Sequence, residues 1–536
     1  MHRLIRTVFV IAIAAQVPSS AGFAQPPAGR GAANRAPAAP GPWFNVPLPP
    51  PFGAAPAVTV GDRQPRPVVL PSGEPAAPEL VGITIRADLD AIIAFAKESR
   101  TTKEIGSGQM WGRVTGFPSS TKTVGWAADQ FRKAGIADVR VQPIAQEANA
   151  SFWMPLSWEV TILGDPAFGP GSRNVVLESA IPLSPSNLPS GTMTAPLVYV
   201  GTANPSVLQH IDVKGKIAVQ LTVPQGHMLF ERGTIASRSQ DLLRRGAVGV
   251  FNLVRLPGNE RSRDFSNCGN PCFNLGGRDG LFLESVLDRA SQAGLGDKVR
   301  VQIALQTETR SGLKAENAVA LIPGRSAEVI IINAHVDGWF DGAGDNADGL
   351  AVLIGLARHF AKPANRPDRT LVFVASAGHH SPGMNGPRNF VTANPDLIKR
   401  AILMLNIEHV AQRNFSPARS TFDDGYRRAV ADTGEAPIVP GVSNDAPFLH
   451  GLMQEGVTRY GVNFISTTSE VESGETGGYS GLNLARVTVI QAPPLYHTTG
   501  EVSDVISTPG LERIARFFAF FVKEVGKAPR AQVNPS

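Results

Sequence analysis

The chain has 536 residues, a formal net charge of +5 and 18% charged residues. Because its basic residues form no long runs, the composition excludes the charge pattern of proteins that bind nucleic acids or anionic membranes. A chain of this length exceeds the usual size of one domain, so we expect at least two.

Residues 1–24 have the pattern of a secretory signal peptide. Arg3 and Arg6 precede an apolar run over 8–15, and small residues continue as far as Ala24. This run is much shorter than the roughly 20 apolar residues that span a bilayer, and no later segment reaches that length. We therefore predict cleavage and export to the periplasm or the extracellular space, without a membrane span.

Composition divides the rest of the chain into three parts. Residues 25–79 are rich in Pro, Ala and Gly and are predicted to form a linker. Residues 80–190 and 308–530 are predicted to form one discontinuous domain. Residues 191–307 contain short predicted strands and no cluster of His and carboxylates, so we interpret them as an inserted β-rich module.

The inserted segment contains the two cysteines of the chain, Cys268 and Cys272, in "SNCGNPCFN". In an exported protein, two close cysteines are typical of a small disulfide loop. The alternative is half of a metal site, but the chain has no second cysteine pair to complete one. The sequence therefore predicts a disulfide.

Strands and helices alternate after residue 308. "VIIINAH" (329–335) and "TLVFVASA" (370–377) are apolar runs typical of buried strands, and "NADGLAVLIGLARHFA" (346–361) between them has helical spacing. "AILMLNIE" (401–408) and "RVTVIQA" (486–492) are two further predicted strands. This alternation predicts an α/β fold with a mostly parallel or mixed central sheet flanked by helices.

Polar side chains follow four of the predicted strands, at the point where each strand ends. In open parallel sheets, ligands bind beyond the carboxyl ends of the strands. Imidazole nitrogens and carboxylate oxygens are ligands that suit zinc. Five such ligands exceed the four of one tetrahedral ion, but a carboxylate shared between two ions would accommodate them. We therefore expect one or two zinc ions. The predicted ligands are His335, Asp345, His380, Glu408 and His497.

Residues beside these positions are interpreted differently. Asp337 lies two residues after His335 and is predicted to accept the hydrogen of its other ring nitrogen, as metal-bound histidines usually require. His409 follows Glu408 directly, and neighbouring strand residues face opposite sides, so His409 is predicted to be structural. Glu475 lies in the polar stretch "SEVESGETGGYSG" and is predicted to be solvated.

Two motifs carry a family resemblance: "NAHVDGWFDGAGDNADGLAVLIGLAR", and Tyr-His-Thr before a polar turn. They resemble the motifs of the co-catalytic dizinc aminopeptidase family, which includes secreted bacterial aminopeptidases, glutamate carboxypeptidases and the non-catalytic transferrin receptor. The resemblance extends over about 80–185 and 311–527, and "DVKGKIAV" and "RRGAVGVF" in the insert resemble a protease-associated domain. The matching motif positions are His335, Asp337, Asp345, Asn346, Tyr496, His497 and Thr498.

The resemblance implies a zinc-exopeptidase fold and a role for each matching residue. It implies that His335 and His497 hold separate metals and that Asp345 bridges them. Glu408 stands where family members usually have an aspartate ligand, and it keeps an oxygen donor on a side chain that is longer by one carbon.

The stretch "VASAGHHSPG" departs from the family pattern. Family members usually have two adjacent glutamates there, of which the first is the general base and the second is a ligand. Here His379 stands at the base position and His380 at the ligand position. Zinc accepts imidazole readily, and a neutral imidazole can accept a proton. We therefore take His379 and Asp337 as the candidate catalytic residues.

The sequence predicts an exported metal-dependent peptidase, of aminopeptidase type, that hydrolyses peptide or aminoacyl amide bonds. Two alternatives stay open, a non-catalytic binding protein on the same scaffold and a single-metal site with altered chemistry. The presence of His335, Asp345 and His497 favours the enzyme, because a binding scaffold has no need of them. The expected partner is a peptide or a small amide, and the sequence makes no prediction of the oligomeric state.

Overall fold

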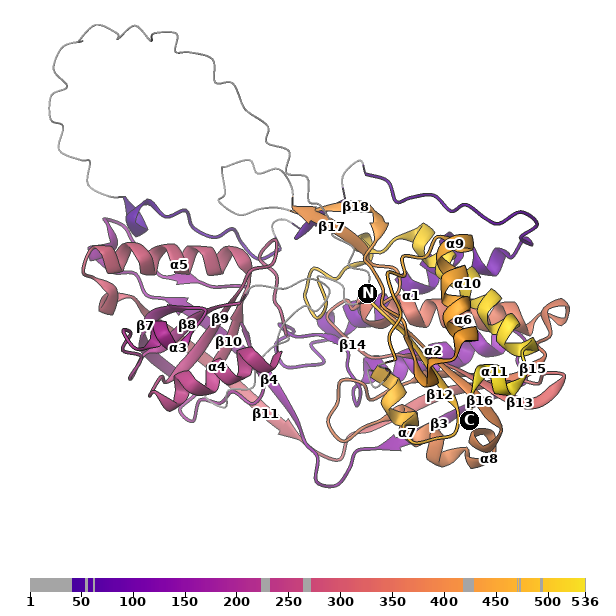
Figure 1. The fold of residues 1–536 in the computed structure, drawn as a ribbon. Helices are drawn as coiled ribbons and strands as arrows, with labels where there is room; N and C mark the ends of the chain where they lie inside the picture. The colour runs from indigo at the N-terminus through magenta and orange to yellow at the C-terminus, as the bar shows by residue number, and fades with distance from the viewer. Residues whose placement is uncertain are drawn as a thin grey trace, which may run out of the picture. The chain divides into compact units, whose positions relative to one another are not determined.

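The protein is described from a computed structural model, shown in Figure 1. The described residues are 41–53, 56–60, 63–222, 232–263, 271–417, 429–469, 471, 474–491 and 495–535. The predicted signal peptide lies outside these ranges, and so does Cys268, so the disulfide stays a prediction. Within the described ranges, no helix combines the length and the apolar character that a bilayer crossing requires.

A seven-stranded mixed sheet forms the centre of the larger domain, with the strand order β19-β20-β16-β13-β15-β12-β3. The four strands β20, β16, β13 and β15 are parallel neighbours, and β12, β3 and β19 join at the edges in antiparallel pairing. The predicted α/β fold with a mixed central sheet is confirmed. The strands are β3 (Asp138–Ala145), β12 (Lys314–Ile322), β13 (Ser326–His335), β15 (Arg369–Ser376), β16 (Ala401–Glu408), β19 (Gly441–Val442) and β20 (Ala485–Ile490).

Both faces of this sheet are covered, which explains why its central strands read as continuous apolar runs. Along β15, Leu371 and Phe373 belong to one hydrophobic cluster, and Val372 and Val374 belong to another, which also contains Phe390. This alternation follows from the twofold repeat of a strand. The helices of this domain are α1 (Gly82–Thr101), α2 (Pro118–Lys133), α6 (Asp348–Ala361), α7 (Gly386–Ala393), α8 (Pro395–Arg400), α9 (Pro447–Tyr460), α10 (Thr508–Lys527) and α11 (Arg530–Val533).

A second sheet has eight strands in the order β5-β4-β11-β7-β8-β9-β10-β6. Three of its strands, β4, β5 and β6, precede residue 191, the predicted start of the insert. β4 pairs along its length with β11, so the sheet includes chain from outside the predicted insert. Pairing between segments so far apart in sequence has no local signal. The strands are β4 (Phe152–Ile162), β5 (Val175–Val176), β6 (Ile181–Pro182), β7 (Thr192–Gly201), β8 (Ile217–Thr222), β9 (Gly249–Val254), β10 (Cys272–Leu275) and β11 (Arg300–Arg310), accompanied by α3 (Pro205–Leu208), α4 (Arg232–Arg244) and α5 (Gly277–Gln292).

Parts of the segment predicted as a linker pack against the rest of the chain. Trp43, in the short 3-10 helix Pro42–Asn45, is buried and stacks on Phe168 with ring centroids 5.4 Å apart. Farther along, β1 (Val58–Thr59) pairs with β18 (Ala429–Glu435). The Pro-rich composition predicted a linker, but isolated aromatic and β-branched residues within it bury apolar surface.

Candidate metal centre

The predicted ligands meet at the carboxyl edge of the seven-stranded sheet. His335 is the last residue of β13, and Glu408 is the last residue of β16. His379 and His380 follow the end of β15, and His497 comes after β20 in the sequence. The parallel direction of these strands brings residues that are far apart in sequence to one place.

Asp345 lies at the centre of this cluster and is fully buried. Its Oδ1 atom lies 3.2 Å from His335 Nε2 and 2.9 Å from His409 Nε2. Its Oδ2 atom lies 2.9 Å from Nε2 of both His380 and His497. Each oxygen of one carboxylate therefore faces two imidazole rings.

Glu408 adds a second carboxylate, which is directed by its neighbour. Its Oε2 atom accepts a hydrogen bond from Asn406 Nδ2 at 2.8 Å. Its Oε1 atom faces the cluster, 3.6 Å from Nε2 of His335 and 3.6 Å from Nε2 of His409. Burial raises the pKa of both Glu408 and Asp345, but the surrounding imidazoles lower each of them below the ordinary value.

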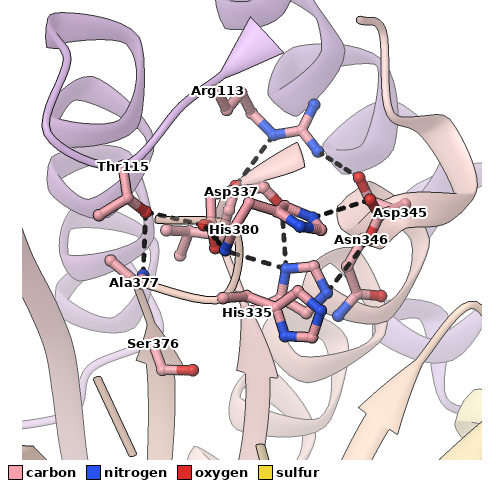
Figure 2. A network of polar contacts seen from close by, with 12 residues as sticks. Arg113, Thr115, His335, Asp337, Asp345, Asn346, Ser376, Ala377 and His380 are labelled. Atoms are coloured by element: carbon pink, nitrogen blue, oxygen red, sulfur yellow. Dashed lines mark hydrogen bonds and ion pairs between the residues drawn. The ribbon is translucent and has the colours of Figure 1, made fainter. Parts of the chain in front are cut away.

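Asp337 supports the cluster in a way that differs from the prediction. The ring nitrogen His335 Nδ1 lies 2.8 Å from the main-chain oxygen of Asp337 and 3.5 Å from its carboxylate. The carboxylate instead accepts hydrogen bonds from the Thr115 hydroxyl at 2.8 Å and from the backbone N–H of His380 at 3.0 Å (Figure 2). Asp337 therefore positions both histidines, one through its backbone and one through its side chain.

The loop between His335 and Asp345 is held by Arg113, which is fully buried at the end of β2 (Gly112–Arg113). Its guanidinium donates to the main-chain oxygens of Val336, Asp341, Gly342 and Asp345 at 2.8–3.2 Å. Figure 2 shows Arg113 beside Asp345. The sequence offered no signal for this role, because the two partners are more than 200 residues apart.

His379 pairs with a carboxylate that the sequence placed in solvent. Its Nδ1 atom lies 2.8 Å from Glu475 Oε1, and the Glu475 side chain is only 2% exposed, so the prediction of a solvated Glu475 is wrong. The His379 ring stacks on His335 with centroids 4.3 Å apart. Burial lowers the pKa of His379, but the carboxylate of Glu475 outweighs burial and raises it to about 9.

A cavity of about 440 Å³ opens beside these groups. Its lining combines polar and apolar residues. His379, His380 and Glu475 supply ionisable groups, and Met384 and Pro387 supply apolar surface. A pocket with this lining beside a cluster of candidate ligands has the character of a substrate-binding site.

His409 is buried and joins the cluster, which the strand alternation failed to predict. The strand β16 ends at Glu408, and His409 has a φ of 50°. The alternation of faces applies only within a strand, so a left-handed residue directly after its end can point the same way as its neighbour. His497 also has a positive φ, at 56°.

The inserted segment reaches the centre next to His497. Ser262 and Thr498 form an isolated antiparallel bridge. The backbone N–H of Arg263 donates to the His497 carbonyl at 3.0 Å. The Arg263 guanidinium lies over the Trp339 ring, 3.8 Å from its centroid. A candidate ligand on one domain is thus fixed by the backbone of the other.

The donor set fits zinc. Imidazole nitrogens and carboxylate oxygens are its common ligands, and both kinds converge here in a buried cluster. His335 Nε2 has no hydrogen-bond partner among the described residues, and His335 Nδ1 is occupied by a carbonyl oxygen. A neutral His335 therefore turns a lone pair toward two carboxylates, and a cation between them would relieve the repulsion.

Comparisons with known proteins agree with this geometry. Residues 317–522 match peptidase family M28. The protein named "Probable lipoprotein aminopeptidase LpqL" of Mycobacterium tuberculosis is 26% identical over 395 residues, which cover 70% of this chain and 69% of that protein. A glutamate carboxypeptidase 2 homolog of Caenorhabditis briggsae is 27% identical over 194 residues, which cover 29% of this chain and 25% of that protein.

Solved structures share the fold at low sequence identity. A peptidase M28 precursor from Shewanella amazonensis has a TM-score of 0.57 at 17% identity, covering 83% of this chain and 98% of that chain. A zinc aminopeptidase from Bacillus subtilis has a TM-score of 0.54 at 16% identity, covering 84% of this chain and 98% of that chain. The match of residues 317–522 to peptidase family M28 and the shared fold support the predicted likeness to the dizinc exopeptidase family.

Proposed function

We propose that the protein is an exported metal-dependent peptidase of aminopeptidase type, which hydrolyses peptide or aminoacyl amide bonds. The observation that carries the proposal is the arrangement of four imidazoles around the two oxygens of Asp345, beside a cavity lined by His379. The match of residues 317–522 to peptidase family M28 supports the hydrolase, and the signal-like N-terminus supports export.

His335, Asp345, His380, Glu408 and His497 are the proposed zinc ligands. When bound there, zinc supplies Lewis acidity, which polarises a substrate carbonyl and makes a water molecule more acidic. The support for these ligands is the burial of His335, Asp345, Glu408 and His497 and the close spacing of donor atoms in overlapping groups that share His335 or Asp345. We propose that one or two ions bind.

His379 is the proposed general base, in place of the usual glutamate. Its Nε2 atom lies 3.8 Å from Glu408 Oε1 and thus faces the ligand cluster, and its Nδ1 atom is held by Glu475. In the proposed reaction, His379 accepts a proton from the water that adds to the substrate carbonyl carbon. The C–N bond then breaks, and the same proton passes from His379 to the leaving amine.

Glu475 and bound cations act on His379 in opposite directions. The carboxylate favours the imidazolium and raises the pKa, whereas divalent cations nearby disfavour it. A base works best when its pKa lies near the operating pH. The Glu475 carboxylate therefore stabilises the protonated form of His379, which nearby metal ions destabilise. His379 can then hold the proton until it passes to the leaving amine.

The test is to purify the mature protein, measure bound zinc, and assay a panel of aminoacyl amides with and without a chelator. We expect turnover that the chelator abolishes and added zinc restores. His379→Ala should lower kcat by about 10²–10⁴-fold with unchanged zinc content. His450→Ala is the matched control, because this histidine lies on α9 and contacts Thr467.

Two outcomes would contradict the peptidase. Bound zinc without turnover, unchanged by His379→Glu, would leave a metal-binding protein without catalysis. A mature protein that binds no zinc would favour the non-catalytic scaffold.

A further inference from the structure

We infer that His409 is a metal ligand, and that it completes a closed four-donor site with His335, Asp345 and Glu408. The inference deepens the proposed function, because it rests on the same metal centre. It makes the two halves of that centre unequal. One half has four protein donors, and the other has three, Asp345 Oδ2, His380 and His497.

The hydrogen bonds of His409 determine which of its nitrogens can bind a metal. Its Nδ1 atom lies 2.9 Å from the main-chain oxygen of Gln491, which can only accept, so Nδ1 carries the hydrogen. In a neutral ring, Nε2 then holds a lone pair, and this atom lies 2.9 Å from Asp345 Oδ1. At that distance the two lone pairs repel each other unless a proton or a metal cation lies between them. His335 has the same arrangement: its Nδ1 atom lies beside the main-chain oxygen of Asp337, and its Nε2 atom faces Asp345 Oδ1.

Four of the six distances between the proposed donors are close to those of a tetrahedral zinc site. Asp345 Oδ1 lies 3.2 Å from His335 Nε2 and 2.9 Å from His409 Nε2. Glu408 Oε1 lies 3.6 Å from each of the same two nitrogens. Ligands about 2.0–2.1 Å from a tetrahedral zinc lie about 3.3–3.4 Å from one another. All four distances fall within about 0.5 Å of that spacing.

The backbone conformation of His409 independently supports its role as a metal ligand. A φ of 50° is unfavourable for a residue with a β-carbon. Such strain persists where the surroundings require it, and it concentrates at functional sites. His497, a predicted ligand on the other oxygen of Asp345, has a φ of 56°. The two histidines thus reach Asp345 from the same kind of strained turn.

The inequality of the two halves has a chemical consequence. A zinc site with four protein ligands is closed and structural in character, whereas a catalytic site keeps a position open for water or substrate. Among the described residues, the half at Asp345 Oδ2 has three donors, and His380, one of them, lines the cavity. We therefore assign tight, slowly exchanging binding to the His409 half and catalysis to the His380 half.

The test is zinc binding by His409→Asn, measured by competition with a chromophoric chelator in the absence of substrate. Asparagine carries its Nδ2–H at the position of ring Nδ1, so it keeps the bond to Gln491, and it tolerates a positive φ. It lacks the ε nitrogen. We expect the tighter zinc affinity to fall by more than about 100-fold, because residues that only support a ligand cost about 10–100-fold.

The matched control is His450→Asn, which should leave both zinc affinities unchanged. Equal melting temperatures of wild type and His409→Asn in excess chelator would show that the variant folds. A loss smaller than about 100-fold overturns the inference, because a supporting role explains it. Loss of turnover with unchanged zinc affinity also overturns it, whereas intact zinc binding without peptidase activity in the wild type contradicts only the proposed function.

A second measurement does not depend on substituting His409. His497→Asn removes a ligand from the other half, so that one equivalent of zinc occupies the closed half. X-ray absorption should then count two imidazoles on the zinc, from His335 and His409. A count of one imidazole overturns the inference.

Discussion

At the scale of single residues, the centre depends on side chains that hold other side chains in place. Arg113 donates to main-chain oxygens on both sides of the loop that ends at Asp345. Glu475 fixes the ring of His379 through Nδ1 and leaves Nε2 toward the ligands. Neither Arg113 nor Glu475 lies in a recognisable sequence motif. Arg113 nevertheless holds the loop of Asp345 in place, and Glu475 determines the direction of His379 Nε2.

Glu475→Gln is expected to reduce kcat by about 10²-fold while KM and zinc content change little. The amide oxygen can still accept from Nδ1, but it lacks the charge that stabilises the protonated ring, so proton transfer is impaired rather than substrate binding. Steady-state kinetics and metal analysis of the same preparation check this. Glu455→Gln, an exposed residue of α9, is the control. An unchanged kcat would exclude the His379–Glu475 pair from the proton transfer.

At the scale of secondary structure, the helices around the sheet are joined by ion pairs whose carboxylates are buried. Glu79 lies in the short helix Pro78–Leu80 and is 7% exposed. It contacts His359 Nδ1 at 2.7 Å and the ammonium of Lys362, at the end of α6. Burial raises the pKa of Glu79, but the bonds from Lys362 and His359 outweigh it and lower the pKa below 4.5.

This lowered pKa predicts how the stability of Glu79→Gln depends on pH. A carboxylate with a lower pKa in the folded state stabilises it above the unfolded pKa, and this stability is lost as pH falls through the folded value. We expect Glu79→Gln to cost about 1.5–3 kcal/mol at neutral pH, the range for hydrogen bonds to charged groups. The cost should shrink as the pH falls below 4.5.

Denaturant unfolding of wild type and Glu79→Gln, at neutral pH and in acid, checks this dependence. Glu98→Gln is the control, because its ion pair with Lys122 is largely exposed and surface pairs contribute about 0–1 kcal/mol. If the difference between wild type and Glu79→Gln stayed the same at all pH values, the effect would come from packing.

At the scale of the whole molecule, the inserted segment is part of the architecture of the candidate metal centre. The hydrophobic cluster of its sheet, which contains Phe251 and Phe273, also contains Trp111, Trp339 and Phe340 from the larger domain. The bridge of Ser262 with Thr498 then continues this contact to the loop of His497. Zinc affinity should therefore depend on the backbone of the insert.

Arg263→Pro is expected to weaken zinc binding at the His497 half by about 10–100-fold, because proline removes the N–H that holds the His497 carbonyl. Arg263→Ala keeps this N–H and removes only the guanidinium over Trp339, so its zinc affinity should stay close to that of the wild type. Competition with a chelator measures both variants. Equal losses in the two would assign the effect to the side chain and contradict a role of the backbone bridge.

The sequence by itself determined the α/β class and the residues at the strand ends. Apolar runs such as β15 and β16 are long, local signals, and the ends of parallel strands lie at one edge of a sheet. For that reason the pattern of residues was enough to predict that His335, His380, Glu408 and His497 lie together. The proximity of Asp345 followed from its place directly before α6.

Only the tertiary structure decided how these residues are supported and what completes them. Glu475 and Arg113 reach the centre from segments far away in sequence, so no local pattern could indicate their partners. His409 required the φ of one residue, which the alternation of a strand cannot supply. The physical reason is that hydrophobic periodicity is a property of regular elements, whereas the chemistry here depends on the irregular residues immediately beyond their ends.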